Sequence, residues 1–214
     1  MAEVGRFITF EGGEGSGKST QCARLAEFLT QAGIETVVTR EPGGTEGAQA
    51  IRDLVVSGAG DRWGPVSEAL LMYAARRDHV DRVIKPALSN GKWVICDRFS
   101  DSTLAYQGYG RELGADWIAQ LDRLSLDGFK PDLTLLLDMP VSTGLARAAE
   151  RGGPDRFEKL GSTFHESLRQ AFLSIASREP DRIVTVSAEG SMNAVSERIQ
   201  AVVLDRFALP GAPA

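Results

Sequence analysis

The chain has 214 residues, of which 43% are apolar and 25% charged, a composition typical of a folded α/β protein rather than a disordered or fibrous one. Its 24 Lys and Arg stand against 29 Asp and Glu, giving a net charge of −5 at pH 7, whereas proteins that bind a long nucleic-acid backbone usually carry a basic excess. The two cysteines lie far apart and the chain has two histidines, so a Cys/His metal cluster is excluded and any metal needs oxygen ligands.

The apolar runs of the chain are short. The longest, at 133–137, is far below the roughly 20 residues that a helix needs to span a bilayer, and the first residues contain no cationic leader. We therefore expect a single domain over 1–214, located in the cytoplasm, with neither a membrane nor a nucleic acid as partner.

Short β-rich runs alternate with segments of helical period along the chain. In chain order the expected elements are strand 6–10, helix 18–31, strand 35–39, helix 46–57, helix 66–89, strand 92–96, helices 101–106 and 115–126, strand 132–138, helices 141–150 and 163–178, strand 182–186 and helix 192–207.

The expected strands are apolar throughout, which is typical of a parallel sheet covered on both faces. This predicts a three-layer α/β/α fold with a five-stranded parallel sheet. Ligands in such folds bind beyond the carboxyl ends of the strands. A Gly-Gly-Pro break after Arg151 separates two helices and predicts a small helical lid over about 147–160.

Residues 12–19 read GGEGSGKS and match the pattern G-x-x-x-x-G-K-[ST] between a predicted strand and a predicted helix. Glycine amides and the helix N-terminus would surround phosphate oxygens, Lys18 would reach the β- and γ-phosphates, and the Ser19 hydroxyl would bind Mg²⁺. This predicts a P-loop NTPase fold that binds ATP or GTP with Mg²⁺. The expected contacts are Gly12, Gly13, Glu14, Gly15, Ser16, Gly17, Lys18, Ser19 and Thr20.

A regulatory GTPase would need the guanine-reading tetrapeptide N-K-x-D, which the chain lacks. A kinase instead needs arginines near the phosphate loop, because their planar guanidinium groups bind phosphate through two hydrogen bonds. The phosphate loop itself contains no arginine, so the positive charge must come from elsewhere. The candidates are Arg40 and Arg98 after predicted strands, and Arg147, Arg151 and Arg156 around the Gly-Gly-Pro break.

Five sequence blocks, in this order, resemble the bacterial type of the thymidylate kinase family, from about residue 7 to 203. They are FEGGEGSGKST, TREPGGT, EALLMYAARRDHV, VICDRFSDSTLAYQGYGR and LARAAERGGPDRFE. The resemblance implies the reaction ATP + dTMP ⇌ ADP + dTDP, with Mg²⁺ as cofactor, and a homodimer.

The resemblance also implies roles for residues near the phosphates. Arg98 would bind the dTMP phosphate, with Arg40 near the same site, and Asp97 would lie beside Mg²⁺ together with Ser19. Glu14 would approach the 3′-hydroxyl of the deoxyribose. Arg151 and Arg156 would be the catalytic arginines of the lid, and Arg147 would reach the adenine or its phosphates.

Further residues would surround the thymidine. Arg76 would hydrogen-bond the base, Thr103 and Gln107 would lie near its N3, and Tyr106 would lie near the sugar. The family commonly stacks thymine on a phenylalanine, whereas this chain has Met72 at the matching position, so the stacking contact departs from the family pattern. Tyr73 and His79 are expected only to pack around the site.

Two alternatives remain open from the residues alone. One is a kinase for another nucleoside monophosphate or for a deoxynucleoside, although Arg98 favours an acceptor that already carries a phosphate. The other is a P-loop sensor without catalytic activity, which would not need arginines directed at phosphates.

Overall fold

A parallel sheet forms the centre of the computed structural model, which describes residues 5–57, 62–151 and 160–209. The strands are β1 (Phe7–Gly12), β2 (Thr36–Arg40), β3 (Trp93–Asp97), β4 (Leu133–Asp138) and β5 (Ile183–Ser187). Their order is β2-β3-β1-β4-β5, and every pairing is parallel. The predicted five-stranded parallel sheet is therefore confirmed.

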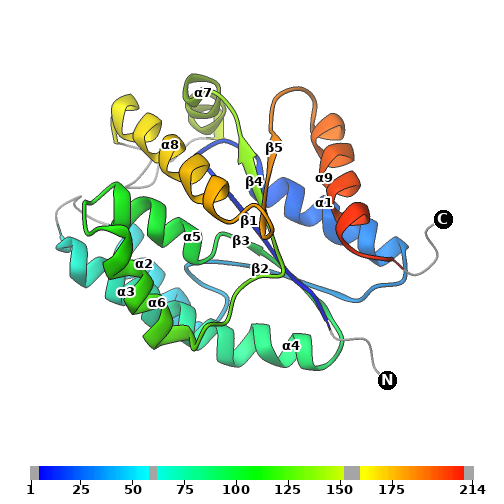
Figure 1. The fold of residues 1–214 in the computed structure, drawn as a ribbon, viewed down its shortest axis with the longest axis horizontal. Helices are drawn as coiled ribbons and strands as arrows, with labels where there is room; N and C mark the ends of the chain where they lie inside the picture. Colours follow the sequence, from blue (N-terminus) through cyan, green and yellow to red (C-terminus); the bar gives the residue numbers. More distant parts are fainter. Residues whose placement is uncertain (1–4, 58–61, 152–159, 210–214) are drawn as a thin grey trace.

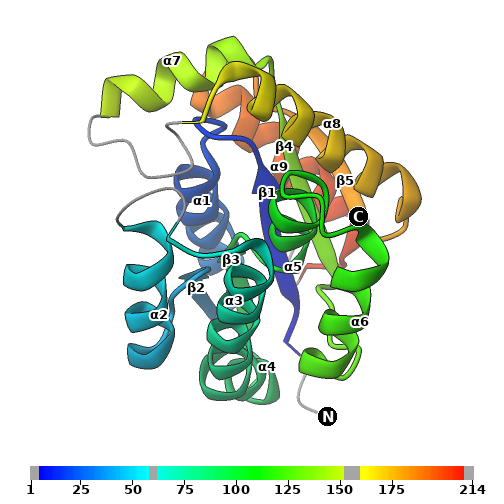
Figure 2. The same ribbon diagram turned by 90° about the vertical axis from the view of Figure 1, so that its left-hand side faces the viewer.

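Helices cover both faces of this sheet, which confirms the three-layer architecture. The helices are α1 (Lys18–Gln31), α2 (Glu46–Val56), α3 (Pro65–His79), α4 (Lys85–Ser89), α5 (Ser100–Thr103), α6 (Ala115–Leu126), α7 (Val141–Arg151), α8 (Ser162–Arg178) and α9 (Met192–Arg206). Figure 1 shows α1 and α9 on one side of the sheet and α3, α5 and α8 on the other. Turned by 90°, α7 lies across the top of the molecule beside α8 (Figure 2).

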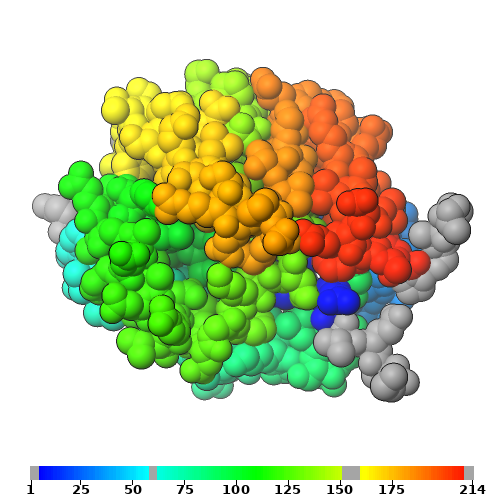
Figure 3. Space-filling model, in the orientation of Figure 1, coloured from blue at the N-terminus to red at the C-terminus, as the bar shows by residue number. Residues whose placement is uncertain are grey.

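Each face of the sheet has its own apolar core. On one face Phe10 and Leu135 pack with Leu25 of α1 and Ile199 of α9, all of them buried. In the space-filling view α8 and α9 close over the strands, which are almost hidden (Figure 3).

Among the residues that the structure describes, no helix combines the length and the apolar content that crossing a membrane requires.

Two helices differ from their predicted form. The expected helix 66–89 consists of α3, a π turn η1 (Val80–Ile84) and α4, joined end to end. Pro86 explains the wider turn, because proline has no N–H to donate and its ring collides with the carbonyl four residues earlier in a regular α-helix. The expected helix 101–106 is α5 followed by a second π turn, η2 (Leu104–Tyr109).

The second π turn ends at a glycine for a steric reason. A Cβ atom at Gly110 would lie 2.6 Å from the carbonyl oxygen of Tyr106, so a larger residue would not fit the tight end of η2. Single π turns are frequent at functional sites, because they change which side chains a helix presents. Here η2 carries Tyr106 and Gln107, which both line a cavity at the edge of the sheet.

Candidate active site

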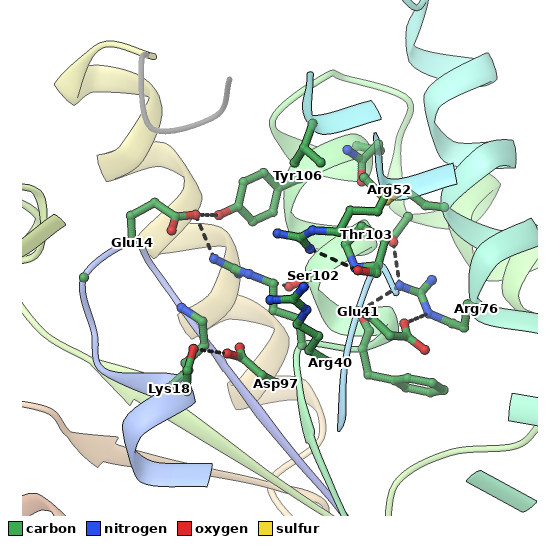
Figure 4. A pocket seen from close by; sticks show the side chains of 18 of the residues that line it. Glu14, Lys18, Arg40, Glu41, Arg52, Arg76, Asp97, Ser102, Thr103 and Tyr106 are labelled. Carbon is green, nitrogen blue, oxygen red and sulfur yellow. Dashed lines mark hydrogen bonds and ion pairs between the residues drawn. The ribbon is translucent and has the colours of Figure 1, made fainter. Parts of the chain in front are cut away.

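The carboxyl ends of β1, β2 and β3 meet at one edge of the sheet. Phe10 of β1 is in register with Asp97 of β3, which is in register with Arg40 of β2. A cavity of about 240 Å³ opens at this edge, between the phosphate loop, the loop after β2, helix α3 and the segment after β3. Figure 4 shows Glu14, Lys18 and Asp97 on one side of this cavity and Glu41 and Arg76 on the other.

The phosphate loop connects β1 to α1, as predicted. Gly17, which caps α1, has φ 87°, a left-handed conformation that a side chain would strain. The Lys18 ammonium is buried and donates to the carbonyl oxygens of Gly12 at 3.0 Å and Gly13 at 2.8 Å. Burial lowers the Lys18 pKa. The lysine thus lies along the loop whose amides would receive phosphate oxygens.

Ser19 and Asp97 place two oxygen donors side by side at the mouth of this loop. The Ser19 hydroxyl donates to Asp97 Oδ2 at 2.5 Å. Hydroxyl and carboxylate oxygens are the ligand types that Mg²⁺ prefers, and Mg²⁺ usually completes its shell with water and substrate phosphates. The described residues contain no group of three or more His, Cys, Asp or Glu that could hold a metal by themselves. The two oxygens therefore fit Mg²⁺ bound jointly with a nucleotide.

Arg98 follows β3 and has φ 71°, which is rare for a residue other than glycine and common at functional sites. Its guanidinium donates to Glu14 Oε1 at 2.7 Å and to the Gly12 carbonyl at 3.1 Å. The guanidinium also lies 5.3 Å from the ring centre of Tyr106, whose hydroxyl donates to Glu14 at 2.6 Å. Arg98 thus bridges the phosphate loop and the π turn η2 across the cavity.

Glu14 is ionised by its neighbours. Burial alone would raise its pKa, but the charges of Arg98 and Lys18 and the hydroxyl of Tyr106 outweigh burial and lower the pKa to about 2. The carboxylate is therefore an acceptor at neutral pH, and it faces the cavity. Such a group can accept a hydrogen bond from a ligand hydroxyl.

Beneath Arg98 lies Glu11, which was not predicted as a site residue. Its carboxylate accepts hydrogen bonds from the Phe99 amide at 2.8 Å, the Ser102 amide at 3.1 Å and the Ser102 hydroxyl at 2.6 Å. Burial and the nearby charge of Asp101 raise its pKa to about 7. An acidic residue directly after the predicted strand 6–10, at the start of the glycine-rich loop, was the sequence signal that could have identified it.

A second buried network holds α5 to the sheet. Arg182 donates to both oxygens of Asp101, at 2.7 and 2.8 Å, and to the Thr134 hydroxyl at 2.8 Å. Thr134 also bonds Thr9 of the central strand at 2.7 Å. The segment that carries Arg98 is therefore anchored both by β1 and by the residue that precedes β5.

The far side of the cavity contains Arg76 and Thr103 in contact. Arg76 Nη2 donates to the Thr103 hydroxyl and to the Phe99 carbonyl, both at 3.0 Å, and Nε donates to Glu41 Oε2 at 2.6 Å. Its Nη1 atom is buried and has no hydrogen-bond partner among the described residues. Because Arg76 lines the cavity, Nη1 is a donor that a ligand could use.

Other predicted residues also line this cavity, including Met72, Tyr106 and Gln107. Gln107 donates to the buried Glu68 at 2.8 Å, which fixes its amide. Arg40 is exposed at the rim. Arg52 of α2, which was not predicted, lines the same cavity and donates to the Pro42 carbonyl at 3.0 Å.

The predicted lid arginines lie apart from this cavity or outside the described residues. Arg147 of α7 donates to the Ala188 carbonyl at 3.3 Å, beside the loop after β5, and does not line the cavity. Arg151 ends α7, but its side chain is outside the described residues, as is all of Arg156.

Helix α7 meets the phosphate loop at a contact between two glycines. A Cβ atom at Gly144 would lie 2.4 Å from the Glu14 carbonyl oxygen, and a Cβ atom at Gly15 would lie 1.9 Å from the Gly144 carbonyl oxygen. Side chains at either position would separate the two backbones. The helix that leads toward the predicted lid therefore rests directly on the loop that would hold phosphate.

Comparison with known proteins gives concordant results. The family model described as thymidylate kinase matches residues 10–199. The thymidylate kinase of Caulobacter vibrioides is 57% identical over 205 residues, which cover 96% of this chain and 99% of that protein. That of Afipia carboxidovorans is 53% identical over 207 residues, which cover 95% and 91%. The crystal structure of thymidylate kinase from Ehrlichia chaffeensis superposes with a TM-score of 0.77 at 36% identity, covering 93% of this chain and 98% of that one.

The glycine contact predicts the effect of one added methyl group. In Gly144→Ala the new Cβ would displace the Glu14 carbonyl and with it the phosphate loop, so we expect ATP binding to weaken by about tenfold or more. Isothermal titration calorimetry measures this directly. Gly64→Ala is the matched control, because its Cβ would meet nothing within 4 Å at the start of another helix. If Gly144→Ala and Gly64→Ala bound ATP equally well, the contact between α7 and the phosphate loop would not matter for ATP binding.

The buried carboxylate predicts how stability depends on pH. The Glu11 pKa is about 7 in the folded protein against an ordinary 4.5, so as pH rises through this window the unfolded chain loses the proton first and the free energy of unfolding falls, by about 3 kcal/mol. In Glu11→Gln the amide can keep the bonds to Phe99 and Ser102, and this loss should disappear. Urea unfolding of the wild type and of Glu11→Gln from pH 4.5 to 8 measures this difference. If the free energy of unfolding changed with pH in the same way in both proteins, the raised pKa of Glu11 would be refuted.

Proposed function

The chain belongs to the thymidylate kinase family, and from this premise we propose how its residues transfer the γ-phosphoryl group of ATP to dTMP, giving ADP and dTDP. The observation that carries the proposal is the position of Arg98, which links the phosphate loop to the cavity where an acceptor would lie. That position suits a substrate that already carries a phosphate, as dTMP does.

On the donor side, the amides of the phosphate loop and Lys18 bind the ATP phosphates. Ser19 and Asp97 would hold Mg²⁺, which when bound neutralises charge on the β- and γ-phosphates. Lys18 contacts the carbonyls of Gly12 and Gly13, so its ammonium lies within the loop that would surround the phosphates. The remaining contacts of the loop are those of glycine and serine backbone with phosphate oxygens.

On the acceptor side, Arg98 and Arg40 hold the dTMP phosphate in line with the γ-phosphate. No general base is needed, because the attacking oxygen belongs to an anion. Glu14 accepts a hydrogen bond from the 3′-hydroxyl of the deoxyribose. Its low pKa supports this role, because it keeps the side chain ionised and therefore an acceptor. The ring of Tyr106 lies beside the sugar and leaves no room for a 2′-hydroxyl.

Base selection rests on Arg76, because a guanidinium group can only donate. The buried Nη1 atom therefore requires an acceptor, such as the C4 carbonyl of thymine. Cytosine presents an amino group at this position and would leave two donors facing each other. Thr103 and Gln107 lie near N3, and the flexible thioether of Met72 packs on the ring where the family has an aromatic residue.

The lid over 147–160 completes the site in this proposal, with the whole chain, 1–214, acting as one domain. Arg151 or Arg156 stabilises the charge of the transferred group and excludes water, and Arg147 contacts the adenine or its phosphates. The contact of Arg147 with the loop after β5 supports the last role. A lid arginine is required because the phosphate loop itself has none.

We further propose that the enzyme is a homodimer. Leu54 of α2 and Val66 and Leu70 of α3 are exposed apolar side chains on two helices that pack together, which supports a partner surface there. Analytical ultracentrifugation distinguishes the dimer from a monomer of 23.0 kDa. The cytoplasmic location and the absence of nucleic-acid and membrane partners remain predictions.

A substrate panel is the test of the proposed function. The protein is incubated with ATP, Mg²⁺ and one acceptor at a time: dTMP, dUMP, UMP, dGMP, dCMP, AMP or thymidine. We expect ADP to form fastest with dTMP. Preference for another monophosphate would keep the kinase mechanism and overturn the base-reading residues, whereas no turnover with any acceptor would favour the nucleotide sensor.

Replacing Arg98 tests the acceptor clamp. Arg98→Ala should raise the dTMP KM and lower kcat, reducing kcat/KM by about 100-fold or more, because the reacting oxygen is no longer held. Steady-state kinetics with each substrate varied in turn separates the two sites. Lys18→Ala should abolish phosphoryl transfer. Arg77→Ala, which removes an exposed arginine of α3, is the control and should change neither KM nor kcat by much. If only the ATP KM changed, Arg98 would bind a phosphate of ATP and not the phosphate of dTMP, and the proposal would be wrong.

The lid arginines give a separate prediction. Arg156→Ala or Arg151→Ala should lower kcat by about 1,000-fold for whichever residue stabilises the transferred group, with smaller changes in either KM. Single-turnover measurements identify the step affected. If both variants keep normal kcat, the compensating charge comes from another part of the chain.

A further inference from the structure

Glu41 connects two residues of α3 that lie one turn apart. Its Oε2 accepts from Arg76 Nε at 2.6 Å, and its Oε1 lies 2.9 Å from Nδ1 of His79. The three residues are buried, with exposed fractions of 3% for Arg76, 4% for Glu41 and 0% for His79. Both oxygens of one carboxylate are thus engaged out of contact with water.

His79 is itself held from the other side. Its Nε2 atom bonds the Thr39 hydroxyl of β2 at 2.7 Å. A Cβ atom at Gly44 would lie 2.4 Å from the same Nε2, so the loop after β2 packs closely on the imidazole. The ring therefore has a fixed orientation between the sheet, the loop and Glu41, although it does not line the cavity.

These contacts determine how Arg76 presents its guanidinium. Nε is bound to Glu41 and Nη2 to Phe99 and Thr103, which leaves Nη1 as the atom without a partner among the described residues. If the Glu41 carboxylate turned about its axis, it would lose either Arg76 or His79. The bond between Glu41 and His79 thus helps to fix the plane of the guanidinium, together with the rings of Tyr73 and Phe99, whose centres lie 4.7 and 5.2 Å from its central carbon.

We propose that His79 is a positioning residue for base recognition, acting through Glu41 to aim Arg76 Nη1 at a pyrimidine that carries a carbonyl at that point. The proposal rests on the proposed contact of Arg76 with the base. It assigns to His79 a role in discriminating thymine from cytosine, and none in binding ATP.

The test compares the kinetics of dTMP and dCMP in His79 variants. His79→Ala should raise the dTMP KM by about tenfold and reduce the preference for dTMP over dCMP by a similar factor, with the ATP KM unchanged. His79→Asn should recover much of the preference, because an amide N–H can occupy the place of Nδ1–H and donate to Glu41. Thr39→Val removes the outer bond alone and should have a smaller effect in the same direction.

Two further variants make the outcome decisive. Tyr73→Phe removes a partly buried hydrogen bond of α3, 2.9 Å to Asp122, but keeps the ring that lies 4.7 Å from the Arg76 guanidinium, so it should leave the dTMP preference unchanged whatever it does to thermal stability. Arg76→Lys tests the base contact itself. If Arg76→Lys lowers the preference and folded His79→Ala does not, the positioning role is overturned. If Arg76→Lys has no effect, the base contact fails instead. Should His79→Ala not fold, Thr39→Val decides in its place: an unchanged preference for dTMP in that variant would overturn the positioning role.

Discussion

The position of Arg98 depends on a carboxylate buried beneath it. Three donors from Phe99 and Ser102 converge on Glu11, and they hold the turn that follows β3. This turn places Arg98 at φ 71°, a conformation that costs a non-glycine residue about 1 kcal/mol or more. These hydrogen bonds offset that cost and hold the guanidinium at the phosphate loop. Preorganised charge of this kind needs no rearrangement during the reaction.

The arginines of the cavity differ in how tightly they are held. Arg76 and Glu41 have side-chain exposures of 3% and 2%, whereas Arg98 and Glu14 have 17% and 11%. A fully buried pair adds little net stability, but breaking it is costly, so Arg76 keeps one geometry. The more open pair leaves Arg98 able to meet a phosphate while it still contacts Glu14. One arginine thus suits the reading of a rigid base, and the other suits a group that moves during transfer.

Most elements of the fold follow from local sequence. Apolar runs such as 133–137 and the glycine-rich loop at 12–17 have one physical interpretation in a parallel sheet, and the structure agrees to within about two residues. The two π turns could not be predicted. Pro86 indicates that the helix around it is irregular, but it does not indicate that the irregularity is a π turn. Met72, Arg76 and Gln107 were expected at the cavity, and they line it.

Apart from Arg52, which lines the cavity itself, the residues that sequence reasoning missed support the site through distant partners. Glu11 acts on residues after β3, Arg182 acts on α5, and Glu41 joins the loop after β2 to α3. Each pairing depends on strand order and register, which determine what lies opposite a side chain. Strand order and register cannot be read from the local pattern of a single sequence, and only the motif resemblance drew attention to the loop around Glu41.

The contact between Gly15 and Gly144 has a consequence for protein engineering. Two backbones that touch without intervening side chains behave as one piece, so the first turn of α7 belongs mechanically to the phosphate loop. A chimera that takes its lid from another kinase should therefore keep the sequence of this chain through Gly144 and switch to the other sequence only after that residue. The boundary between the nucleotide-binding body and the proposed lid would then lie inside α7, after Gly144, and not at the loop where this helix begins.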